Sequence, residues 1–228
     1  MLEKNAAAAT EPLVELKNVF LVSDRGGYVF RDLNLTLEAG RSAVITGVAG
    51  SGKTSLVELM IGRRFAECGT VRLFNRELKK GKKRVINRVR EKIGGVGGVF
   101  GLLPSLTVAE NITLPMVISG IRKKIQQERL LKLLSEFSLL KQAGEYPPNL
   151  TRVENYLVQF ARASIAGQPL IIIDEPSAGL DLKTYQRIFD YLIKISISGR
   201  SMIILTSEKP PLEIPQTDHY LLENGTLI

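Results

Sequence analysis

A stretch of glycines followed by a lysine and a threonine has the residue types and spacing that phosphate binding requires. Residues 47–54 fit the pattern G-x-x-x-x-G-K-S/T in full, with an apolar run before it and a helical apolar pattern after it. Glycines let successive backbone N–H groups approach phosphate oxygens, and the N-terminus of the next helix adds partial positive charge. A glycine-rich turn without a ligand is the alternative, but both flanks favour a nucleotide-binding loop. The predicted nucleotide-binding residues are Gly47, Gly50, Ser51, Gly52, Lys53, Thr54 and Ser55.

Two acidic residues directly follow an aliphatic run, and they suit the metal and water chemistry of a nucleotide site. Leu170–Ile173 has the composition of a strand buried on both faces, which leaves Asp174 and Glu175 at its carboxyl end. In such a site Lys53 would bridge the β and γ phosphates of ATP, while Thr54 and Asp174 would hold Mg²⁺. Glu175 stands where it could polarise an attacking water, and we assign it the catalytic role if the chain is active.

Composition excludes several classes of protein. The chain has 228 residues, 44% of them hydrophobic and 24% charged, which is typical of a globular chain with a substantial core. Cys68 is the single cysteine and His219 the single histidine, so a disulfide framework and a multi-histidine metal site are excluded. No apolar run is long enough to span a bilayer, and the first residues lack the apolar stretch of a secretion signal. We therefore expect a soluble chain in the cytoplasm.

The positions of apolar residues predict alternating strands and helices. Alternation at Val14–Val19 and Leu33–Leu37 predicts strands of an antiparallel edge sheet, and Ser42–Thr46 and Met202–Thr206 are short apolar strands. Helical spacing predicts a helix over residues 126–141 and further helices around the apolar residues Leu56, Leu59, Met60, Leu157, Phe160, Ala161, Ile188, Leu192 and Ile195. Strands that alternate with helices indicate an α/β fold.

We predict a P-loop NTPase core with a mostly parallel sheet, an antiparallel β edge subdomain and an inserted helical subdomain at about residues 104–165. Residues 1–12 are expected to be a flexible tail, and residues 13–228 a single domain.

The net charge is +8, and part of it comes from nine basic residues between Arg76 and Lys92. A solvated turn and helix face explains this cluster as well as a patch that faces an anion does. The overall charge indicates an anionic neighbour, either nucleic acid or the inner face of a membrane.

Beyond these motifs, the segments Glu38–Gly40, Leu102–Ile112 and Glu175–Asp181 resemble the nucleotide-binding subunits of ABC transporters. Within that family, Leu102–Ile112 looks most like the lipoprotein-release, macrolide-export and cell-division subclass. The resemblance covers nearly the whole chain. It implies a single ABC-type ATP-binding domain on the cytoplasmic face of a membrane, with Asp181 as the aspartate of the family's D-loop. The implied partners are membrane-spanning permease subunits and a second ATP-binding subunit, either the same chain or a relative.

The chain departs from the family at its signature sequence. Where the family has Leu-Ser-Gly-Gly-Gln, this chain has Leu150-Thr151-Arg152-Val153-Glu154. In the family this segment is offered across the dimer to the γ-phosphate of the partner's nucleotide. Here Arg152 and Val153 bring side chains where backbone should approach, and Glu154 adds negative charge, although Thr151 could keep a hydroxyl contact.

Two further family residues are replaced. Gly98 stands at the position of the Q-loop glutamine, and Ser207 stands where the family has its switch histidine. Five glycines at positions 94–101 are expected to make the Q-loop segment flexible and to loosen its coupling to the helices. His219 is expected to be an ordinary surface residue.

The family's adenine-stacking aromatic residue is also in doubt. Ser23 stands in its place, although Tyr28 or Phe30 could reach the base.

These losses predict an ATP-binding subunit with reduced or absent hydrolysis and an assembly or regulatory role in a membrane complex. A positioned acid–base group contributes ~10²–10⁴ in rate, and a trans element that stabilises the transferring phosphoryl group ~10³–10⁵. A divergent but active transport ATPase that drives export or lipoprotein extraction is one alternative. A soluble nucleic-acid-associated ABC protein is another, but the chain is too short for the known kinds, so no nucleic acid is expected.

Overall fold

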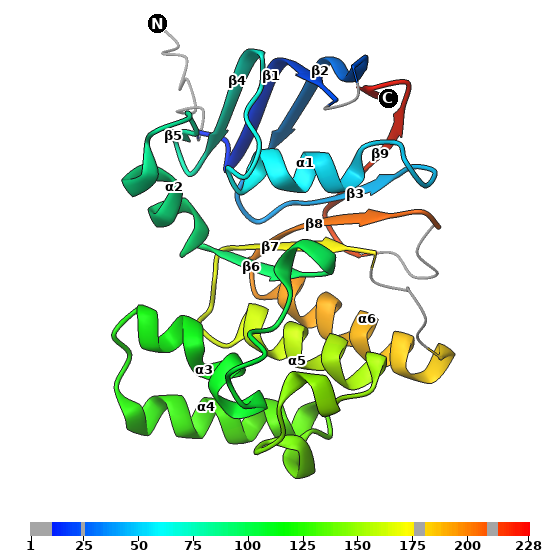
Figure 1. Cartoon of the computed structure of the whole chain (residues 1–228). Helices are drawn as coiled ribbons and strands as arrows, with labels where there is room; N and C mark the ends of the chain where they lie inside the picture. The colour runs from blue at the N-terminus through cyan, green and yellow to red at the C-terminus, as the bar shows by residue number, and fades with distance from the viewer. Residues whose placement is uncertain (1–10, 24–25, 176–180, 209–213) are drawn as a thin grey trace, which may run out of the picture.

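Two sheets organise the computed structural model, which describes residues 11–23, 26–175, 181–208 and 214–228 (Figure 1). The larger sheet has the strand order β10-β9-β3-β8-β7-β6, and its neighbouring strands are parallel except for the antiparallel pair β9–β10. Its strands are β3 (Ser42–Thr46), β6 (Ile93–Val96), β7 (Leu170–Asp174), β8 (Ser201–Thr206), β9 (Thr217–Glu223) and β10 (Thr226–Leu227). Every residue of β7 and β8 is buried, as expected for central parallel strands that are covered on both faces.

The smaller sheet is antiparallel and has the order β2-β1-β4-β5. Its strands are β1 (Val14–Val22), β2 (Tyr28–Leu37), β4 (Cys68–Leu73) and β5 (Arg76–Glu77). In β2 the residues Phe30, Leu33, Leu35 and Leu37 are buried. Helix α1 (Lys53–Met60) lies between the two sheets, and its apolar residues join a core cluster shared with both (Figure 1). The predicted α/β fold with an antiparallel edge sheet is therefore confirmed.

The remaining helices cover the other face of the parallel sheet, except α2, which lies beside its β6 edge (Figure 1). Their bounds are α2 (Lys83–Arg90), α3 (Val108–Ile118), α4 (Lys123–Glu136), α5 (Arg152–Ser164) and α6 (Leu182–Ile197), with 3₁₀ turns η1 (Gly98–Phe100), η2 (Leu140–Gln142) and η3 (Pro147–Asn149). Buried residues of α3 to α6 pack with β7 and β8 in a second core cluster. Residues 104–165 thus hold α3, α4 and α5, while the predicted domain and subdomain boundaries stay predictions.

The helix predicted over residues 126–141 has different bounds. Helix α4 begins at Lys123 and ends at Glu136, because Ser138 adopts a left-handed backbone with φ of 59° that a helix cannot include. Leu140, inside the predicted helix range, lies in η2 and is 54% exposed.

The nine basic residues between Arg76 and Lys92 lie on β5, α2 and the adjoining turns, and all but Arg76 are exposed. Arg90 donates to the carbonyl oxygens of Ile61 and Gly62, and Lys79 forms an ion pair with Glu77 at 3.1 Å. The Lys92 ammonium lies 5.2 Å from the centroid of the Phe74 ring. Side chains of three of the nine basic residues thus interact with other groups of the described chain. No described helix is long and apolar enough to cross a membrane.

The cap of α3 gives a test of fold stability away from the candidate site. Thr107 accepts from the backbone N–H of Glu110, whose side chain accepts from the N–H of Thr107, so the two residues form a reciprocal capping box. We expect Thr107→Ala to lower the free energy of unfolding by about 1 kcal/mol, measured by urea denaturation. Ser105→Ala, at an exposed position two residues earlier, is the control and should change it by less than about 0.5 kcal/mol. An equal loss in both variants would contradict the role of the cap.

Candidate functional site

The predicted phosphate loop joins the end of β3 to the start of α1. Gly50 and Gly52 adopt left-handed backbones with φ of 83° and 109°, which side chains disfavour. A Cβ atom at Gly52 would lie 2.9 Å from the Phe30 ring, and one at Gly47 would lie 2.6 Å from the Ser51 hydroxyl. Glycine is therefore required by the backbone conformation at Gly50, by the packing at Gly47, and by both at Gly52.

An open cavity of about 780 Å³ lies between this loop, the carboxyl ends of β6 and β7, and helix α5. Lys53, Thr54, Asp174 and Glu175 all line it, so the structure brings together the predicted phosphate, metal and water-polarising residues. The predicted residues Gly50, Gly52 and Ser55 line it as well. Gly47 and Ser51 belong to the loop without lining the cavity.

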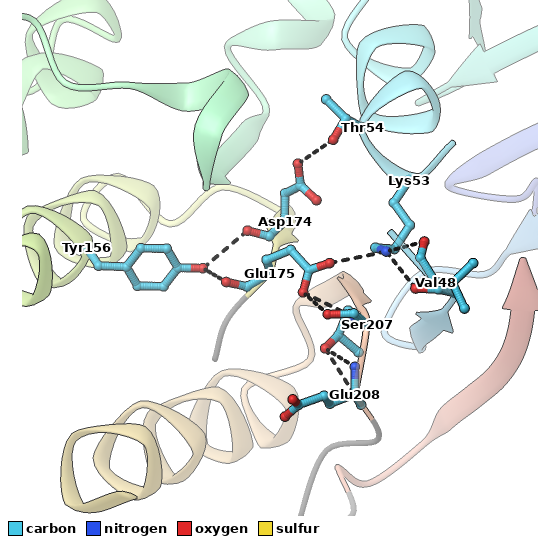
Figure 2. A network of polar contacts seen from close by, with 10 residues as sticks. Val48, Lys53, Thr54, Tyr156, Asp174, Glu175, Ser207 and Glu208 are labelled. Carbon is cyan, nitrogen blue, oxygen red and sulfur yellow. Dashed lines mark hydrogen bonds and ion pairs between the residues drawn. The ribbon is translucent and has the colours of Figure 1, made fainter. Parts of the chain in front are cut away.

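Lys53 is held by the loop and by one carboxylate (Figure 2). Its Nζ donates to the carbonyl oxygens of Gly47 at 2.6 Å and Val48 at 3.1 Å, and lies 3.2 Å from Oε1 of Glu175. Only 7% of the side chain is exposed, so these partners compensate the burial of its charge.

Asp174 has the chemistry of a metal ligand. Its Oδ2 accepts from the Thr54 hydroxyl at 3.2 Å, while its Oδ1 is buried and has no hydrogen-bond partner among the described residues. Burial is the main reason that the pKa of this carboxyl is raised, and the Thr54 hydrogen bond opposes the shift. A hard cation such as Mg²⁺ prefers oxygen ligands and would satisfy the orphaned atom, so Thr54 and Asp174 fit the predicted metal site.

Glu175 is fixed at both its backbone and its side chain (Figure 2). Its backbone is left-handed with φ of 57°, and its carbonyl oxygen accepts from the Tyr156 hydroxyl at 2.7 Å. Its Oε2 accepts from the backbone N–H and the hydroxyl of Ser207, each at 3.0 Å. With Lys53 at Oε1, both carboxylate oxygens have partners within the chain. Burial raises the pKa of the Tyr156 phenol, with the charges of Asp174 and Glu175 as further causes, so the phenol keeps its proton as a donor.

Three of the five glycines at 94–101 pack tightly against neighbouring atoms, and the predicted flexibility of this segment stays a prediction. Gly94 and Gly95 lie in β6, where added Cβ atoms would strike the Ala163 carbonyl and the Phe100 ring. A Cβ atom at Gly97 would lie 2.5 Å from the Asp174 carbonyl oxygen, and φ there is 113°. These three residues are glycines because of close approach, while Gly98 and Gly101 have open space around their Cα atoms.

Helix α5 also contacts this segment directly through two side chains. The Gln159 side-chain oxygen accepts from the Gly97 N–H at 2.8 Å. The Arg162 guanidinium donates to the carbonyl oxygens of Phe100 and Gly101, and burial lowers the pKa of Arg162 to about 10. Repeated glycine predicts mobility only where neighbouring atoms leave room, and sequence alone does not show these neighbours.

The sequence does not predict the roles of Tyr156 and Gln159, because the helix that holds them is predicted from its apolar residues alone. Their spacing of three residues on one helix, N-capped at Thr151, was the available signal.

The hydroxyl of Thr151, which could contact a partner's nucleotide, forms hydrogen bonds within its own helix. It donates to Oε2 of Glu154 at 2.8 Å and accepts from the Glu154 N–H at 3.2 Å. The hydroxyl is therefore used by the cap of its own helix. Hydrogen bonds from Thr151 lower the pKa of Glu154, which stays ionised at the start of α5.

The candidates for stacking on an adenine base differ in their exposure. Phe30 is fully buried beneath Gly52 and cannot reach a base, whereas Tyr28 is 57% exposed and carries the Arg31 guanidinium 5.0 Å from its ring centroid. Ser23 lies in the turn before β2, where its N–H donates to the Gly27 carbonyl at 2.9 Å.

His219 is exposed on β9, as predicted for a surface residue. Asp181 is the N-cap of α6 and accepts from the Thr184 N–H at 3.0 Å. Residues 176–180 of the motif that resembles the family lie outside the described residues.

The chain is similar to known proteins over most of its length. Residues 30–178 match the family model described as ABC transporter. The macrolide export ATP-binding/permease protein of Burkholderia thailandensis is 32% identical over 203 residues, which cover 87% of this chain but only 31% of that protein, so the chain spans about a third of its length. The uncharacterised ABC transporter ATP-binding protein YvrO of Bacillus subtilis is 31% identical over 181 residues, 79% of each chain. The cell division ATP-binding protein FtsE of the same organism is 26% identical over 95% of each.

The fold is similar to that of a solved ATP-binding cassette. A dimeric cassette in a post-hydrolysis state, bound to ADP and Pi, superposes with a TM-score of 0.84 at 26% identity, covering 94% of this chain and 96% of that one.

The raised pKa of Asp174 has a consequence for stability. Above this pKa the carboxylate is ionised in a buried site at a cost in free energy, and below it the cost disappears because the group is protonated. We expect Asp174→Asn to raise Tm at pH 7–8 by about 2–4 °C for each kcal/mol relieved, and the gain to vanish as the pH falls through the pKa of Asp174. Asp190→Asn, at an exposed position, is the control and should show no such gain. A lower Tm for Asp174→Asn at pH 7–8 would show that the charge stabilises the fold.

The close approach at Gly97 gives a matched pair of variants. Gly97→Ala should destabilise the fold by about 1–3 kcal/mol, because it strains a left-handed backbone and pushes the methyl group into Asp174. Gly98→Ala, one residue on, meets no atom within 4 Å and should be nearly neutral. Thermal unfolding measures both. Equal stability of the two variants would refute the packing argument.

Proposed function

The chain belongs to the ABC transporter family, and on that premise we propose that it is the ATP-binding subunit of a membrane transporter complex in which hydrolysis is slow or absent. The observation that carries the proposal is the bonding of Glu175 Oε2 to the backbone N–H and hydroxyl of Ser207, which supplies no group that titrates near neutral pH. Nucleotide binding needs the phosphate loop and the metal ligands, which line one cavity here. Hydrolysis needs in addition a free proton acceptor for the attacking water.

Nucleotide binding follows from the residues around the loop. Lys53 would leave Glu175 and turn its ammonium to the β and γ phosphates, which are stronger anionic partners than two carbonyl oxygens. Thr54 and Asp174 would hold Mg²⁺, which neutralises phosphate charge when bound. Both steps use groups that already face the same cavity, so binding requires side-chain rotation rather than refolding.

Hydrolysis lacks its assisting groups. The Ser207 hydroxyl keeps Glu175 in place but cannot accept and return a proton near neutral pH as an imidazole can. Across a dimer, the start of α5 would present the ionised Glu154 and the side chains of Arg152 and Val153 in place of glycine backbone. The negative charge of Glu154 would repel a γ-phosphate, so a partner's site would gain little from this chain.

The family suggests where such a chain works. We propose that it dimerises with a second ATP-binding subunit and binds membrane-spanning permease subunits on the cytoplasmic face of a membrane. The dimeric cassette of similar fold and the names of the macrolide export and cell division relatives support this setting. The net charge of +8 suits a surface that works beside anionic lipid. An assembly or regulatory role accounts for a binding site that is kept while the aids to hydrolysis are lost.

A working transport ATPase is the second candidate. Lys53, Thr54, Asp174 and Glu175 all persist in one cavity, and Glu175 becomes free at Oε1 once Lys53 turns to a phosphate. This observation keeps slow but real turnover as a competing function.

The experiment measures ATP binding by calorimetry and steady-state ATPase for the wild-type chain, Lys53→Ala, and the exposed control Lys124→Ala. We expect wild type and control to bind MgATP equally, Lys53→Ala to lose binding, and wild-type turnover to lie about 10²-fold or more below the usual enzymatic range of about 1–10³ s⁻¹. Turnover within that range, abolished by Lys53→Ala, would establish the working ATPase instead. Absence of MgATP binding by the wild type at millimolar concentration would overturn both candidates.

A further inference from the structure

A basic surface lies on α2 and on the turn before it. It consists of five exposed side chains, those of Lys80, Lys82, Lys83, Arg84 and Arg88. Among the described residues, none of these five side chains has a hydrogen-bond or ion-pair partner. Residues 78–90 contain no acidic residue, so neighbours along the chain do not compensate the positive charges of the basic surface.

The packing of α2 determines which side of the helix carries these charges. Ile86 and Val89 are buried in the core cluster that α1 shares with the two sheets. Lys83, Arg84 and Arg88 are exposed, so the charged side of the helix is turned toward solvent. Helix α2 lies beside the β6 edge of the parallel sheet (Figure 1), and none of its residues lines the nucleotide cavity. The basic surface is therefore separate from the phosphate loop.

The stability of α2 does not account for its charges. Positive side chains near the N-terminus of a helix oppose the helix dipole, yet Lys82 is the N-cap of α2 and Lys83 and Arg84 follow it, with no acidic residue in the first turn. Arg84 and Arg88 are four residues apart, and like charges at this spacing repel each other. A negatively charged partner would replace both unfavourable interactions with attraction.

The end of α3 lies beside α2 and adds exposed apolar side chains to the same edge of the molecule. Asn87 of α2 and Ile118 of α3 line one open cavity of about 390 Å³, in which Glu91 is the one acidic lining residue. Val117 and Ile118 are exposed. The turn that follows them carries three exposed basic residues at positions 122–124. Positive and aliphatic side chains are thus close together here.

Anionic phospholipid headgroups match this combination. Clusters of four to eight Lys and Arg residues are typical of surfaces that bind anionic lipid, and exposed aliphatic side chains can enter the boundary between headgroups and acyl chains. Single-stranded nucleic acid also offers phosphates, but its bases stack on aromatic side chains. Among the described residues, the exposed phenylalanine or tyrosine residues are Tyr28 and Tyr146, which belong neither to α2 nor to the end of α3. The surface therefore favours lipid over nucleic acid.

We propose that the basic surface binds the anionic phospholipid headgroups of a membrane. The inference rests on the membrane setting of the proposed function and adds to it a surface, its residues and their ligand. Because no residue of α2 lines the nucleotide cavity, binding to headgroups through α2 leaves the residues of the phosphate loop free for ATP.

The test measures binding of the full chain to vesicles by co-sedimentation. Vesicles of phosphatidylcholine with about 30% phosphatidylglycerol are compared with phosphatidylcholine alone, at about 0.1 M NaCl. We expect the wild type to bind the anionic vesicles only, and to be released at about 0.5 M NaCl because salt screens the attraction. The triple variant Lys83→Ala, Arg84→Ala, Arg88→Ala should bind the anionic vesicles about 10-fold more weakly or less.

Two further variants show whether the position of the charges matters. A matched control removes the same amount of charge at exposed positions elsewhere and should bind the vesicles like the wild type: Lys132→Ala, Lys141→Ala, Lys183→Ala. An exchange of Lys for Arg and Arg for Lys at positions 83, 84 and 88 keeps the charge and should also keep binding. The Tm of the triple variant should be unchanged or higher, because alanine favours the helix and the repulsion is removed.

The outcomes separate this inference from the proposed function. A wild type that binds MgATP but not the anionic vesicles overturns the inference alone. Equal losses in the triple variant and its matched control, or loss of binding in the charge-keeping exchange, overturn it as well. Tighter binding to an RNA of about 20 nucleotides, to duplex DNA or to poly-glutamate than to the vesicles would identify a different partner and overturn it too. A wild type that binds the vesicles but no MgATP overturns the proposed ATP binding alone.

Discussion

The approach of Gly97 to Asp174 is the contact on which the rest of the site depends. Parallel pairing of β6 with β7 brings the segment after β6 against the carboxyl end of β7, where a side chain at Gly97 would collide with Asp174. The Asp174 carboxylate beyond this contact is buried, its pKa is raised by that burial, and one of its oxygens has no partner among the described residues. The same segment directs the Gly97 N–H at the side-chain oxygen of Gln159 on α5. The position of Asp174 and the orientation of the Gln159 side chain are thus linked through one segment of backbone.

The electrostatics of the site separate binding from catalysis. In the absence of nucleotide the Lys53 ammonium is compensated by Glu175 and by loop carbonyls, so a phosphate must displace partners that are already close. Ser207 then keeps Glu175 in position without offering a group that titrates near neutral pH. Under the function proposed above, such a site would serve a chain that reports nucleotide occupancy to its partners.

The sequence predicted the local elements better than the contacts between them. The phosphate loop, β7 and the helices α1 and α6 each follow from a local pattern of glycines or apolar residues, and the structure has them where the pattern placed them. The end of α4 was wrong because a single left-handed residue, Ser138, stops a helix whose apolar periodicity continues. The roles of Gln159, Tyr156 and Ser207 depend on partners 19 to 62 residues away along the chain, and no local pattern contains such information. The close contacts of Gly94 and Gly97 likewise depend on residues far away along the chain, Ala163 and Asp174.

The hydrogen bonds from Arg162 and Gln159 to the segment after β6 have a mechanical consequence. Gln159 bonds this segment at Gly97, and Arg162 bonds it at Phe100 and Gly101. Because both side chains belong to α5, the segment should move together with that helix. A rotation of α5 would therefore move this segment, which lines the cavity beside Asp174. Helix α3 packs on α5 and exposes Val117 and Ile118 at 54% and 61%. A displacement of that apolar surface would reach Asp174 through α5 and the segment at Gly97.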